Sequence, residues 1–428
     1  MTRGLLIAAP SSGSGKTTLT LGLLRALSRR GTPVRGAKSG PDYIDPRFHE
    51  AACGAPCPNL DAWAMRPDRL QDLAQGANAD DTVIIEGAMG LFDGAPPAGK
   101  GACADLARRF NIPVILVVDA SRMAGSVAPL VAGFAAHDPS VRVAGVILNK
   151  VGSERHKTML LRALAPSGIP VFGALPRSMT LTHPDRHLGL VQAGERPDLD
   201  AFLDAAADAV EAALDVDAIL ALAAPITSTE HSPLTPRTPP PAQSIAVARD
   251  QAFAFAYPHL LNDWREQGAE IRFFSPLANA APPPCDLVYL PGGYPELHAG
   301  RLAASHVFLQ GLREAAARRT IYGECGGYMV LGDGMIDADG VRHKMAGLLA
   351  LETSFAARKL HLGYRHAVAQ AGPFPGPWSA HEFHYASTIK ATGQPLFEVR
   401  DAENTDLGPQ GLINGSVSGS FLHLIDRA

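Results

Sequence analysis

A phosphate-binding loop near the N-terminus limits the possible folds of this chain more than any other feature. An apolar run, Leu5–Ala9, leads into Pro10–Thr18, which matches the pattern G-x-x-x-x-G-K-[ST] except that Pro10 replaces its first glycine. In such loops backbone N–H groups and a lysine bind phosphates, and a hydroxyl can bind Mg²⁺. A plain Gly/Ser turn is the alternative, but strand, loop and helical pattern follow in the required order. The sequence therefore predicts that a nucleoside triphosphate is bound by Gly13, Ser14, Gly15, Lys16, Thr17 and Thr18.

The first half of the chain alternates short apolar runs with amphipathic stretches, as β-strands alternating with α-helices do. Nearly continuous apolar strands are buried on both faces, so we expect a mostly parallel sheet with helices on both sides. The helical patterns include Thr17–Arg30 and Cys103–Phe110. The predicted strands are Leu5–Ala9, Val34–Lys38, Val83–Glu86, Val114–Asp119, Val143–Asn149 and Val171–Leu175.

A segment rich in proline, serine and threonine separates this half from a second α/β pattern. Such composition favours an extended connector rather than regular structure. We therefore predict a nucleotide-binding domain over residues 1–225, a linker over 226–244 and a second domain over 245–428. The predicted strands of the second domain are Ile245–Arg249, Ile271–Phe274, Leu287–Leu290 and Ile321–Glu324.

The composition excludes several classes of function. The 38 Lys and Arg residues are balanced by 42 Asp and Glu residues, so no basic field is available to attract nucleic acid or anionic lipid. No stretch approaches the roughly 20 apolar residues of a membrane span, and we expect a cytoplasmic protein. The five cysteines are scattered, which predicts free thiols, and Cys53 and Cys57 lack a second pair of metal ligands.

Two polar residues stand at the ends of predicted strands in the first domain. Ligands bind at the carboxyl edge of such sheets, so Glu86 is a candidate Mg²⁺ contact. A solvated or capping role is the alternative for this glutamate. The amide of Asn149 offers both a donor and an acceptor, and it could bind the edge of a nucleotide base.

A second candidate site lies in the second domain, around Cys325. This cysteine follows an apolar strand, is flanked by glycines and precedes a helical stretch, as the nucleophile of a strand–turn–helix elbow does. Gly292 and Gly293 end the preceding strand and could supply a backbone N–H to an oxyanion hole. His423 follows another apolar run and could act as the general base. Most lone cysteines are only small buried hydrophobes, which is the alternative.

The segment Gly323–Gly327, GECGG, resembles the nucleophile motif of class I glutamine amidotransferases, which release ammonia from glutamine through a cysteine thioester. In most of that class a glutamate stands two positions after the histidine, whereas here Ile425 stands there, followed by Asp426. The third member of the triad therefore stays open.

The chain is similar over its whole length to the cobyrinate and hydrogenobyrinate a,c-diamide synthases, which show the same departure. The phosphate-binding half is also similar to dethiobiotin synthetase. The segments that resemble the diamide synthases are Lys38–Pro46, Glu86–Gly94, Ala246–Phe253, Pro291–Glu296 and His381–Tyr385.

The resemblance implies an α/β protein that joins an ATPase domain to a glutamine amidotransferase domain. ATP would phosphorylate a peripheral carboxylate of a corrin ring, and ammonia made at Cys325 and His423 would reach the activated carboxylate along a protected path. Mg²⁺ would act with the co-substrates ATP and L-glutamine, with Thr17, Glu86 and Asp45 as metal contacts. An Asx-type turn is the alternative for the Asp42–Asp45 loop. The residues expected to position substrate, assist the metal or deprotonate ammonia are Lys38, Asp42, Tyr43, Asp45 and Asp93.

Several alternatives stay open at this point. A cobyric acid synthase has the same architecture but amidates other side chains. A dimerising nucleotide-dependent switch is disfavoured because Ser11 stands where such switches carry an extra lysine, and because it leaves Cys325 unexplained. Overall resemblance slightly favours the cobalt-free ring over cobyrinic acid, and a homodimer is compatible with the sequence. The spacing of His381 and His384 argues against a zincin motif and favours an interface or substrate-lining segment.

Overall fold

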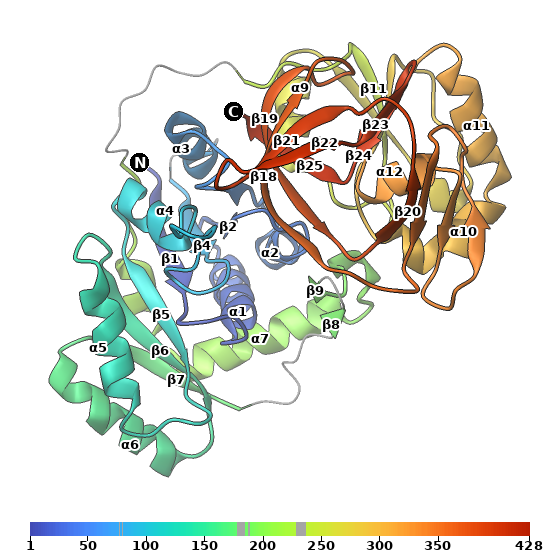
Figure 1. Cartoon of the computed structure of the whole chain (residues 1–428). Coiled ribbons are helices and arrows are strands. Elements are labelled where there is room, and N and C mark those ends of the chain that lie inside the picture. Colours follow the sequence, from blue (N-terminus) through green and yellow to red (C-terminus); the bar gives the residue numbers. More distant parts are fainter. Residues whose placement is uncertain (77, 79, 178–184, 187–188, 228–236) are drawn as a thin grey trace. The chain divides into compact units, whose positions relative to one another are not determined.

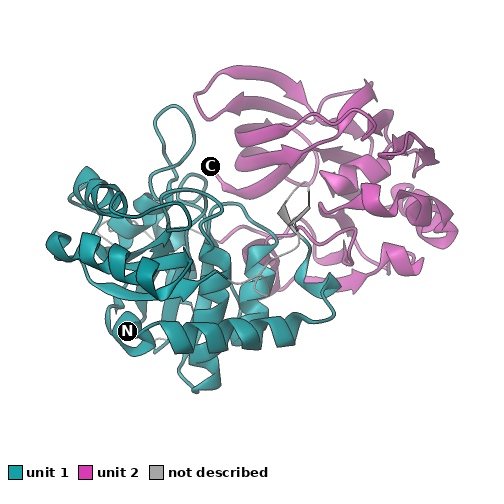
Figure 2. Cartoon of the chain, turned by 90° about the horizontal axis from the view of Figure 1, so that it is seen from below, with its two compact units in different colours: residues 1–235 teal, residues 236–428 magenta. Residues whose placement is uncertain are grey.

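The computed structural model describes the chain except for residues 77, 79, 178–184, 187–188 and 228–236. It contains two compact units, residues 1–235 and 236–428, which Figure 2 shows in different colours. This division falls within the segment that the sequence assigns to a linker, and residues 228–236 of that segment lie outside the described residues.

The first unit is built on a parallel sheet with strand order β3-β2-β4-β1-β5-β6-β7 (Figure 1). A further strand, β10, pairs antiparallel with β1, and β8 pairs with β9. All six strands predicted here are present, with ends within two residues of the prediction, and the expected fold class is confirmed. The strands of this unit are β1 (Arg3–Ala8), β2 (Val34–Ser39), β3 (Asn59–Leu60), β4 (Thr82–Glu86), β5 (Val114–Asp119), β6 (Val143–Val151), β7 (Val171–Pro176), β8 (Asp185–Arg186), β9 (Gly189–Leu190) and β10 (Ala224–Pro225).

Helix α1, which follows the phosphate loop, packs against α7 (Figure 1). Gly22 permits this approach, because a β-carbon at that position would lie 2.6 Å from the carbonyl oxygen of Ala206. Arg25 reinforces it with an ion pair to Asp204, Nε to Oδ1 2.8 Å. The helices of this unit are α1 (Lys16–Arg29), α2 (Asp45–Cys53), α3 (Pro67–Gln75), α4 (Cys103–Phe110), α5 (Val127–His137), α6 (Glu154–Leu164), α7 (Leu199–Ala213) and α8 (Val216–Ala221), with 3₁₀ turns η1 (Ala165–Ser167) and η2 (Ala193–Glu195).

The second unit contains a six-stranded sheet in the order β12-β11-β13-β14-β24-β23. All neighbouring strands in it are parallel except β23 and β24. Its strands are β11 (Ser244–Ala248), β12 (Glu270–Phe274), β13 (Leu287–Leu290), β14 (Thr320–Glu324), β23 (Leu412–Asn414) and β24 (Val417–Ser420). Its helices are α9 (Pro258–Glu266), α10 (Ala299–Ala304), α11 (His306–Ala316) and α12 (Gly326–Leu331), with 3₁₀ turns η3 (Pro276–Ala278) and η4 (Pro295–His298).

Two further sheets in this unit were not predicted from the sequence. One has the order β16-β15-β17-β20, and the other is an antiparallel sheet in the order β22-β21-β18-β19-β25. The second sheet carries His423 on β25. No helix in the described ranges is long and apolar enough to cross a membrane. The strands of these sheets are β15 (Gly334–Ile336), β16 (Arg342–Lys344), β17 (Leu351–Ser354), β18 (His361–Ala369), β19 (Gly376–His384), β20 (Ser387–Ala391), β21 (Phe397–Asp401), β22 (Asp406–Gln410) and β25 (Leu422–Arg427).

Candidate active sites

The phosphate loop has the backbone that its glycines predict. Gly13 and Gly15 have φ values of 76° and 89°, which residues with a β-carbon rarely adopt. Helix α1 begins at Lys16, whose Nζ donates to the carbonyl oxygen of Met89 at 2.6 Å. Burial lowers the pKa of Lys16, and the nearby carboxylate of Glu86 opposes that shift. The loop is thus arranged with the lysine at the start of the helix, as phosphate binding requires.

Asn149 contacts the same loop from the end of β6. Its Nδ2 donates to the carbonyl oxygen of Ser14 at 2.9 Å, and a β-carbon on Gly15 would lie only 2.1 Å from that nitrogen. The next residue, Lys150, donates to the carbonyl oxygen of Gly13 at 2.8 Å. The structure therefore gives Asn149 a contact with the loop, and its contact with a base stays a prediction.

Glu86 lies at the centre of a buried polar cluster at the end of β4. Its Oε1 accepts hydrogen bonds from the Thr17 hydroxyl at 2.6 Å and from Nζ of Lys38 at 2.9 Å. Its Oε2 lies 2.6 Å from Nε2 of His49 on helix α2. His49 is not among the residues predicted from the sequence; the available signal was its position one helical turn after Asp45, on the same face of α2.

Lys38 joins this cluster to Asp45, Nζ to Oδ2 2.6 Å, and Oδ2 of Asp42 lies 3.9 Å away. Burial opposes the charge of Lys38, but Asp45 and Glu86 outweigh it and raise the lysine pKa well above its ordinary value. Burial and the neighbouring Asp42 raise the pKa of Asp45 to about 7. Burial would also raise the pKa of Glu86, but Lys38 and His49 outweigh it and hold that pKa below its usual range.

These groups fit a magnesium ion chemically. Mg²⁺ prefers hydroxyl and carboxylate oxygens, which Thr17, Glu86 and Asp45 supply. Lys38 faces three carboxylates, and Lys16 also interacts with Glu86 and Asp45, so the carboxylates still outnumber the ammonium groups and a further cation is electrostatically favoured there.

The remaining predicted residues of this unit lie in the loops that follow β2 and β4, except Thr18, which lies in helix α1. Asp42 forms the Asx-type turn considered above, since its Oδ1 accepts from the backbone N–H groups of Ile44 and Asp45. Tyr43 is half-buried beside it. Asp93 holds the loop after β4 by accepting from the backbone N–H of Gly90 at 3.0 Å. Thr18 lies in the first turn of α1.

In the second unit, Cys325 occupies a sharp turn between β14 and α12. Its backbone angles, φ 44° and ψ −104°, are rare for a residue with a side chain. The side chain is buried, with Sγ 4.0 Å from the carbonyl oxygen of Phe383. A strained turn at the end of a parallel strand is the backbone expected for a nucleophile elbow.

Gly292 lies close to both the nucleophile Cys325 and the ring of His423. A β-carbon on Gly292 would lie 2.3 Å from Cε1 of His423, 3.2 Å from Nε2 of that ring and 3.3 Å from Cβ of Cys325. The backbone nitrogen of Gly293 lies 3.2 Å from the place of a β-carbon on Gly326, which follows the cysteine. The structure thus brings together all four residues that the sequence proposed for glutamine hydrolysis, although they come from three strand ends.

A carboxylate also lies beside His423, and it is not that of Asp426. Oε2 of Glu324 is 3.9 Å from Nδ1 of His423, and it accepts a hydrogen bond from the Tyr289 hydroxyl at 2.8 Å. The side chain of Asp426 instead accepts from the Thr238 hydroxyl at 3.3 Å. The sequence signal for Glu324 was its place directly before the cysteine.

Burial controls the protonation of this site. It raises the pKa of the Cys325 thiol well above its ordinary value, and it lowers the pKa of His423 to about 3, to which His381 and His384 contribute. It also raises the pKa of Glu324 to about 8. At neutral pH the resting pair is therefore an uncharged thiol and an uncharged imidazole.

Comparison with known proteins matches a different family model to each half of the chain. Residues 5–191 match the family described as CobQ/CobB/MinD/ParA nucleotide binding domain, and residues 244–427 match the CobB/CobQ-like glutamine amidotransferase domain. Two solved structures, a glutamine amidotransferase and the septum site-determining protein MinD of Pyrococcus horikoshii OT3, cover 37% and 42% of the chain. They are 14% and 17% identical, have TM-scores of 0.29 and 0.30, and are covered over 80% and 84% of their own length.

Three full-length relatives carry the name hydrogenobyrinate a,c-diamide synthase. Those of Brucella anthropi and Rhizobium meliloti are each 56% identical over 99% of this chain, which is 98% and 99% of the relative. That of Mesorhizobium japonicum is 52% identical over 100% of this chain and 99% of its own length. With relatives at this identity along its entire length, the chain belongs to the family of hydrogenobyrinate a,c-diamide synthases.

Proposed function

We propose that this chain converts the a and c side-chain carboxylates of hydrogenobyrinic acid into amides, with ATP as the energy source and glutamine as the nitrogen donor. The observation that carries the proposal is that relatives named for this activity match 99% of the chain at 56% identity, both units included. The cobalt-free ring is chosen because those relatives are named for it. Three alternatives can be distinguished by experiment: cobyrinic acid as the substrate, the reaction of a cobyric acid synthase, and a nucleotide-dependent switch that makes no amide.

Glutamine hydrolysis is assigned to the second unit. The thiol of Cys325 transfers its proton to Nε2 of His423 and attacks the carboxamide carbon of glutamine. The backbone N–H groups at Gly292 and Gly293 stabilise the oxyanion. The imidazolium then protonates the departing ammonia, and water hydrolyses the thioester to release glutamate. Glu324, which becomes anionic above a pKa of about 8, would then stabilise the charged form of His423, which is the role of the third member of a catalytic triad.

Amide formation is assigned to the first unit. A carboxylate is a poor acceptor for ammonia until the γ-phosphoryl group of ATP has been transferred to one of its oxygens, with release of ADP. Lys16 binds the phosphates during this transfer, and Mg²⁺ held by Thr17, Glu86 and Asp45 would neutralise their charge. Ammonia attacks the carbonyl carbon of the acyl phosphate, and phosphate leaves.

Burial and Asp42 raise the pKa of Asp45 to about 7 when no ion is bound, and a bound Mg²⁺ would lower it and keep the carboxylate ionised. Asp45 therefore serves as a metal contact rather than as the base that takes a proton from ammonia. Lys38, 2.6 Å from its Oδ2, would hold it in place. A protected path for ammonia, a homodimer and a cytoplasmic location stay predictions from the sequence.

The decisive assay incubates the purified chain with glutamine, Mg-ATP and either hydrogenobyrinic or cobyrinic acid, and counts the added amides by mass spectrometry. We expect two amides on the cobalt-free ring. With Cys325→Ala, amidation should be lost with glutamine and restored with ammonium salts. Amidation of neither ring despite intact ATP hydrolysis would contradict the proposal, and any other number of amides would favour a cobyric acid synthase.

A further inference from the structure

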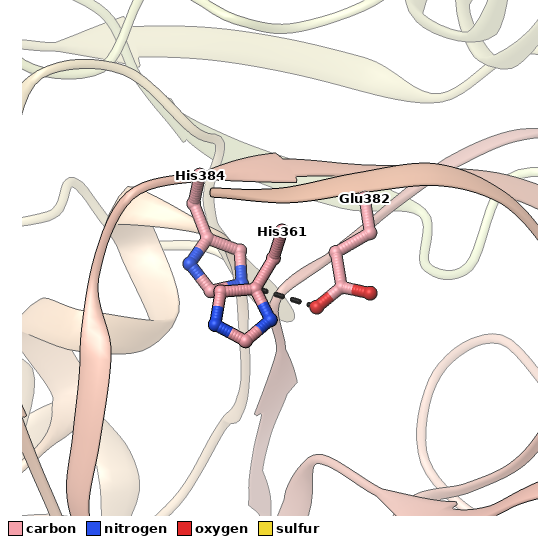
Figure 3. Close-up of side chains that lie close together, drawn as sticks. All are labelled: His361, Glu382 and His384. Carbon is pink, nitrogen blue, oxygen red and sulfur yellow. Dashed lines mark hydrogen bonds and ion pairs between the residues drawn. The ribbon is translucent and has the colours of Figure 1, made fainter. Parts of the chain in front are cut away.

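Three potential metal ligands share one face of a strand pair in the second unit. Strands β18 and β19 are antiparallel, and His361 lies directly opposite His384 in their register. Glu382 precedes His384 by two residues, so its side chain leaves the strand on the same face. Figure 3 shows the two imidazole rings lying one over the other, with the carboxylate of Glu382 beside them. Among the described residues, this is the one group of three such side chains close enough to bind a common ion.

The spacing of the ligand atoms suits a small divalent ion. Nε2 of His384 is 3.1 Å from Oε1 of Glu382, and one ligand atom from each of the three side chains lies within 4.8 Å of the others. Two ligands at bond lengths of about 2.0–2.1 Å on a tetrahedral ion are separated by about 3.3 Å. The histidine–glutamate pair already has this separation. The ring of His361, now stacked parallel to that of His384 at an interplanar angle of 9°, turns out of this stack to direct a nitrogen at the same ion.

Neighbouring groups hold two of the ligands in place. The ring of His384 is stacked on that of Phe421, with centroids 4.0 Å apart. Arg365 donates to Oε2 of Glu382 at 2.8 and 3.0 Å, which leaves Oε1 directed at the histidines. Such orientation of the ligands by their neighbours is typical of metal sites.

The group also opens into a cavity. All three side chains line a cavity of ≈ 440 Å³ within the second unit, together with Tyr328 and Phe421 among others. An ion could enter from there, and a water molecule could supply a fourth ligand.

The reaction proposed above assigns no step to this group, although His384 helps to lower the pKa of His423. His381 lies opposite His423 in the pairing of β19 with β25, and the alternation of side chains along a strand directs Glu382 and His384 to the other face of β19. Within the segment His381–His384, His381 therefore lies on one face of β19, and Glu382 and His384 lie on the other.

We propose that His361, Glu382 and His384 bind a divalent transition-metal ion of the Zn²⁺ class. Imidazole nitrogens select zinc-like ions over Mg²⁺ and Ca²⁺, which prefer all-oxygen sites, and two imidazoles with one carboxylate form a three-ligand zinc site with one open position. The ion joins β18 to β19 and stabilises this sheet. The site is separate from the Mg²⁺ contacts of the first unit.

The test is zinc binding by the full chain. Protein stripped with a chelator is equilibrated with equimolar Zn²⁺ in the absence of ATP and Mg²⁺, gel-filtered and analysed for zinc by elemental mass spectrometry. We expect one zinc per chain, and a thermal unfolding midpoint of the second unit that rises with zinc. His361→Gln and Glu382→Gln should lower the affinity at least tenfold. Because His361 is only half-buried, its variant should fold, and circular dichroism checks this.

Two control variants exclude other zinc sites. His343→Gln removes a histidine that also bonds a carboxylate, Asp337 at 2.7 Å, and it should leave zinc binding unchanged. Cys325→Ala removes the thiol at which zinc could bind together with His423, and it should also keep the zinc. The proposal is overturned if no zinc remains bound to the wild type, if His361→Gln binds it as tightly, or if Cys325→Ala abolishes binding.

Discussion

Oε2 of Glu324 lies 3.9 Å from Nδ1 of His423, and the residue that follows Glu324 in the chain is Cys325. One strand end thus supplies both the nucleophile and the carboxylate nearest to the base, while β25 supplies the base itself. In most class I glutamine amidotransferases this carboxylate follows the histidine by two positions, where Ile425 stands here. In this chain the carboxylate beside His423 comes instead from the end of the parallel strand β14.

Glu324→Gln should lower the rate of glutamine-dependent amidation about 10²–10⁴-fold, because the imidazolium of His423 loses the carboxylate that stabilises it. Amidation with ammonium salts should be unchanged within a few-fold. The measurement is amide formation from each nitrogen source. Glu352→Gln, which removes a carboxylate paired with Arg342 at 2.6 Å near the surface, is the matched control and should retain both activities. Equal loss with both nitrogen sources would contradict this role.

The same carboxyl group predicts a pH dependence. Burial raises the pKa of Glu324 to about 8, so the group becomes anionic as the pH rises through that value. The kcat for glutamine hydrolysis should therefore increase between pH 7 and 9 in the wild type. The Glu324→Gln variant should lack this step when both proteins are assayed for glutamate release over the same range. A step of unchanged size in the variant would assign the titration to another group.

Gly292→Ala should abolish glutamine hydrolysis, because the added carbon would lie 2.3 Å from Cε1 of His423 and 3.3 Å from Cβ of Cys325. We expect a loss of at least 10²-fold with the ammonium-dependent reaction retained. Gly300→Ala provides the comparison, since the nearest atom to its β-carbon would be 3.6 Å away, and it should behave like the wild type. Retention of glutaminase activity in Gly292→Ala would show that the ring moves easily.

Lys38→Met should destabilise the first unit by about 3 kcal/mol, since removing one partner leaves Glu86 and Asp45 buried without their cation. Amidation should be lost with glutamine and with ammonium alike. Urea unfolding followed by hydrogen exchange of first-unit peptides measures the stability. Adding Asp45→Asn should recover part of the lost stability but not the activity. A fully additive double variant would mean that the two residues do not interact.

The second unit should lose stability in mild acid. Burial, and secondarily Arg365, lowers the pKa of His381 to about 4, against about 6.5 when unfolded. Between these values the unfolded chain binds more protons, so stability is present above pH 6.5 and decreases as the pH falls. The free energy of unfolding should therefore fall as the pH is lowered from 7.5 to 5. This fall should be about 2 kcal/mol smaller in His381→Gln than in the wild type.

Tryptophan fluorescence during urea unfolding measures this effect in a Trp63→Phe background. Trp264 and Trp378 are then the remaining tryptophans, and both lie in the second unit. The same pH dependence in the variant as in the wild type would contradict the assignment to His381.

The parallel sheets could be predicted from the sequence because their buried strands are continuous apolar runs. Val114–Asp119 and Leu287–Leu290 were predicted with the bounds that the structure has. The antiparallel sheet formed by β18, β19, β21, β22 and β25 could not be predicted in this way. Strands such as β18 mix polar and half-buried positions, so their period is weak, and their register depends on pairing between distant residues.

The residues of the candidate sites also divide into those that a local sequence motif identifies and those that depend on contacts between distant segments. Residues inside a local motif, such as Lys16 and Cys325, were found because their chemistry depends on neighbours in the sequence. His49 and Glu324 were missed because their partners, Glu86 and His423, become visible only when separate strands are assembled. The sequence signals for these residues, the helical spacing of His49 from Asp45 and the place of Glu324 next to Cys325, do not identify the partner.

The backbone of Cys325 also bears on how this family can change over time. Its φ of 44° is one that glycine adopts readily and other residues adopt only at a cost in stability. Selection for folding alone would therefore favour glycine at this position, and Cys325→Gly should relieve backbone strain. A relative that lost glutamine hydrolysis but kept the fold should drift toward glycine there. The residue at this one turn can consequently distinguish members that make their own ammonia from members that take it from solution.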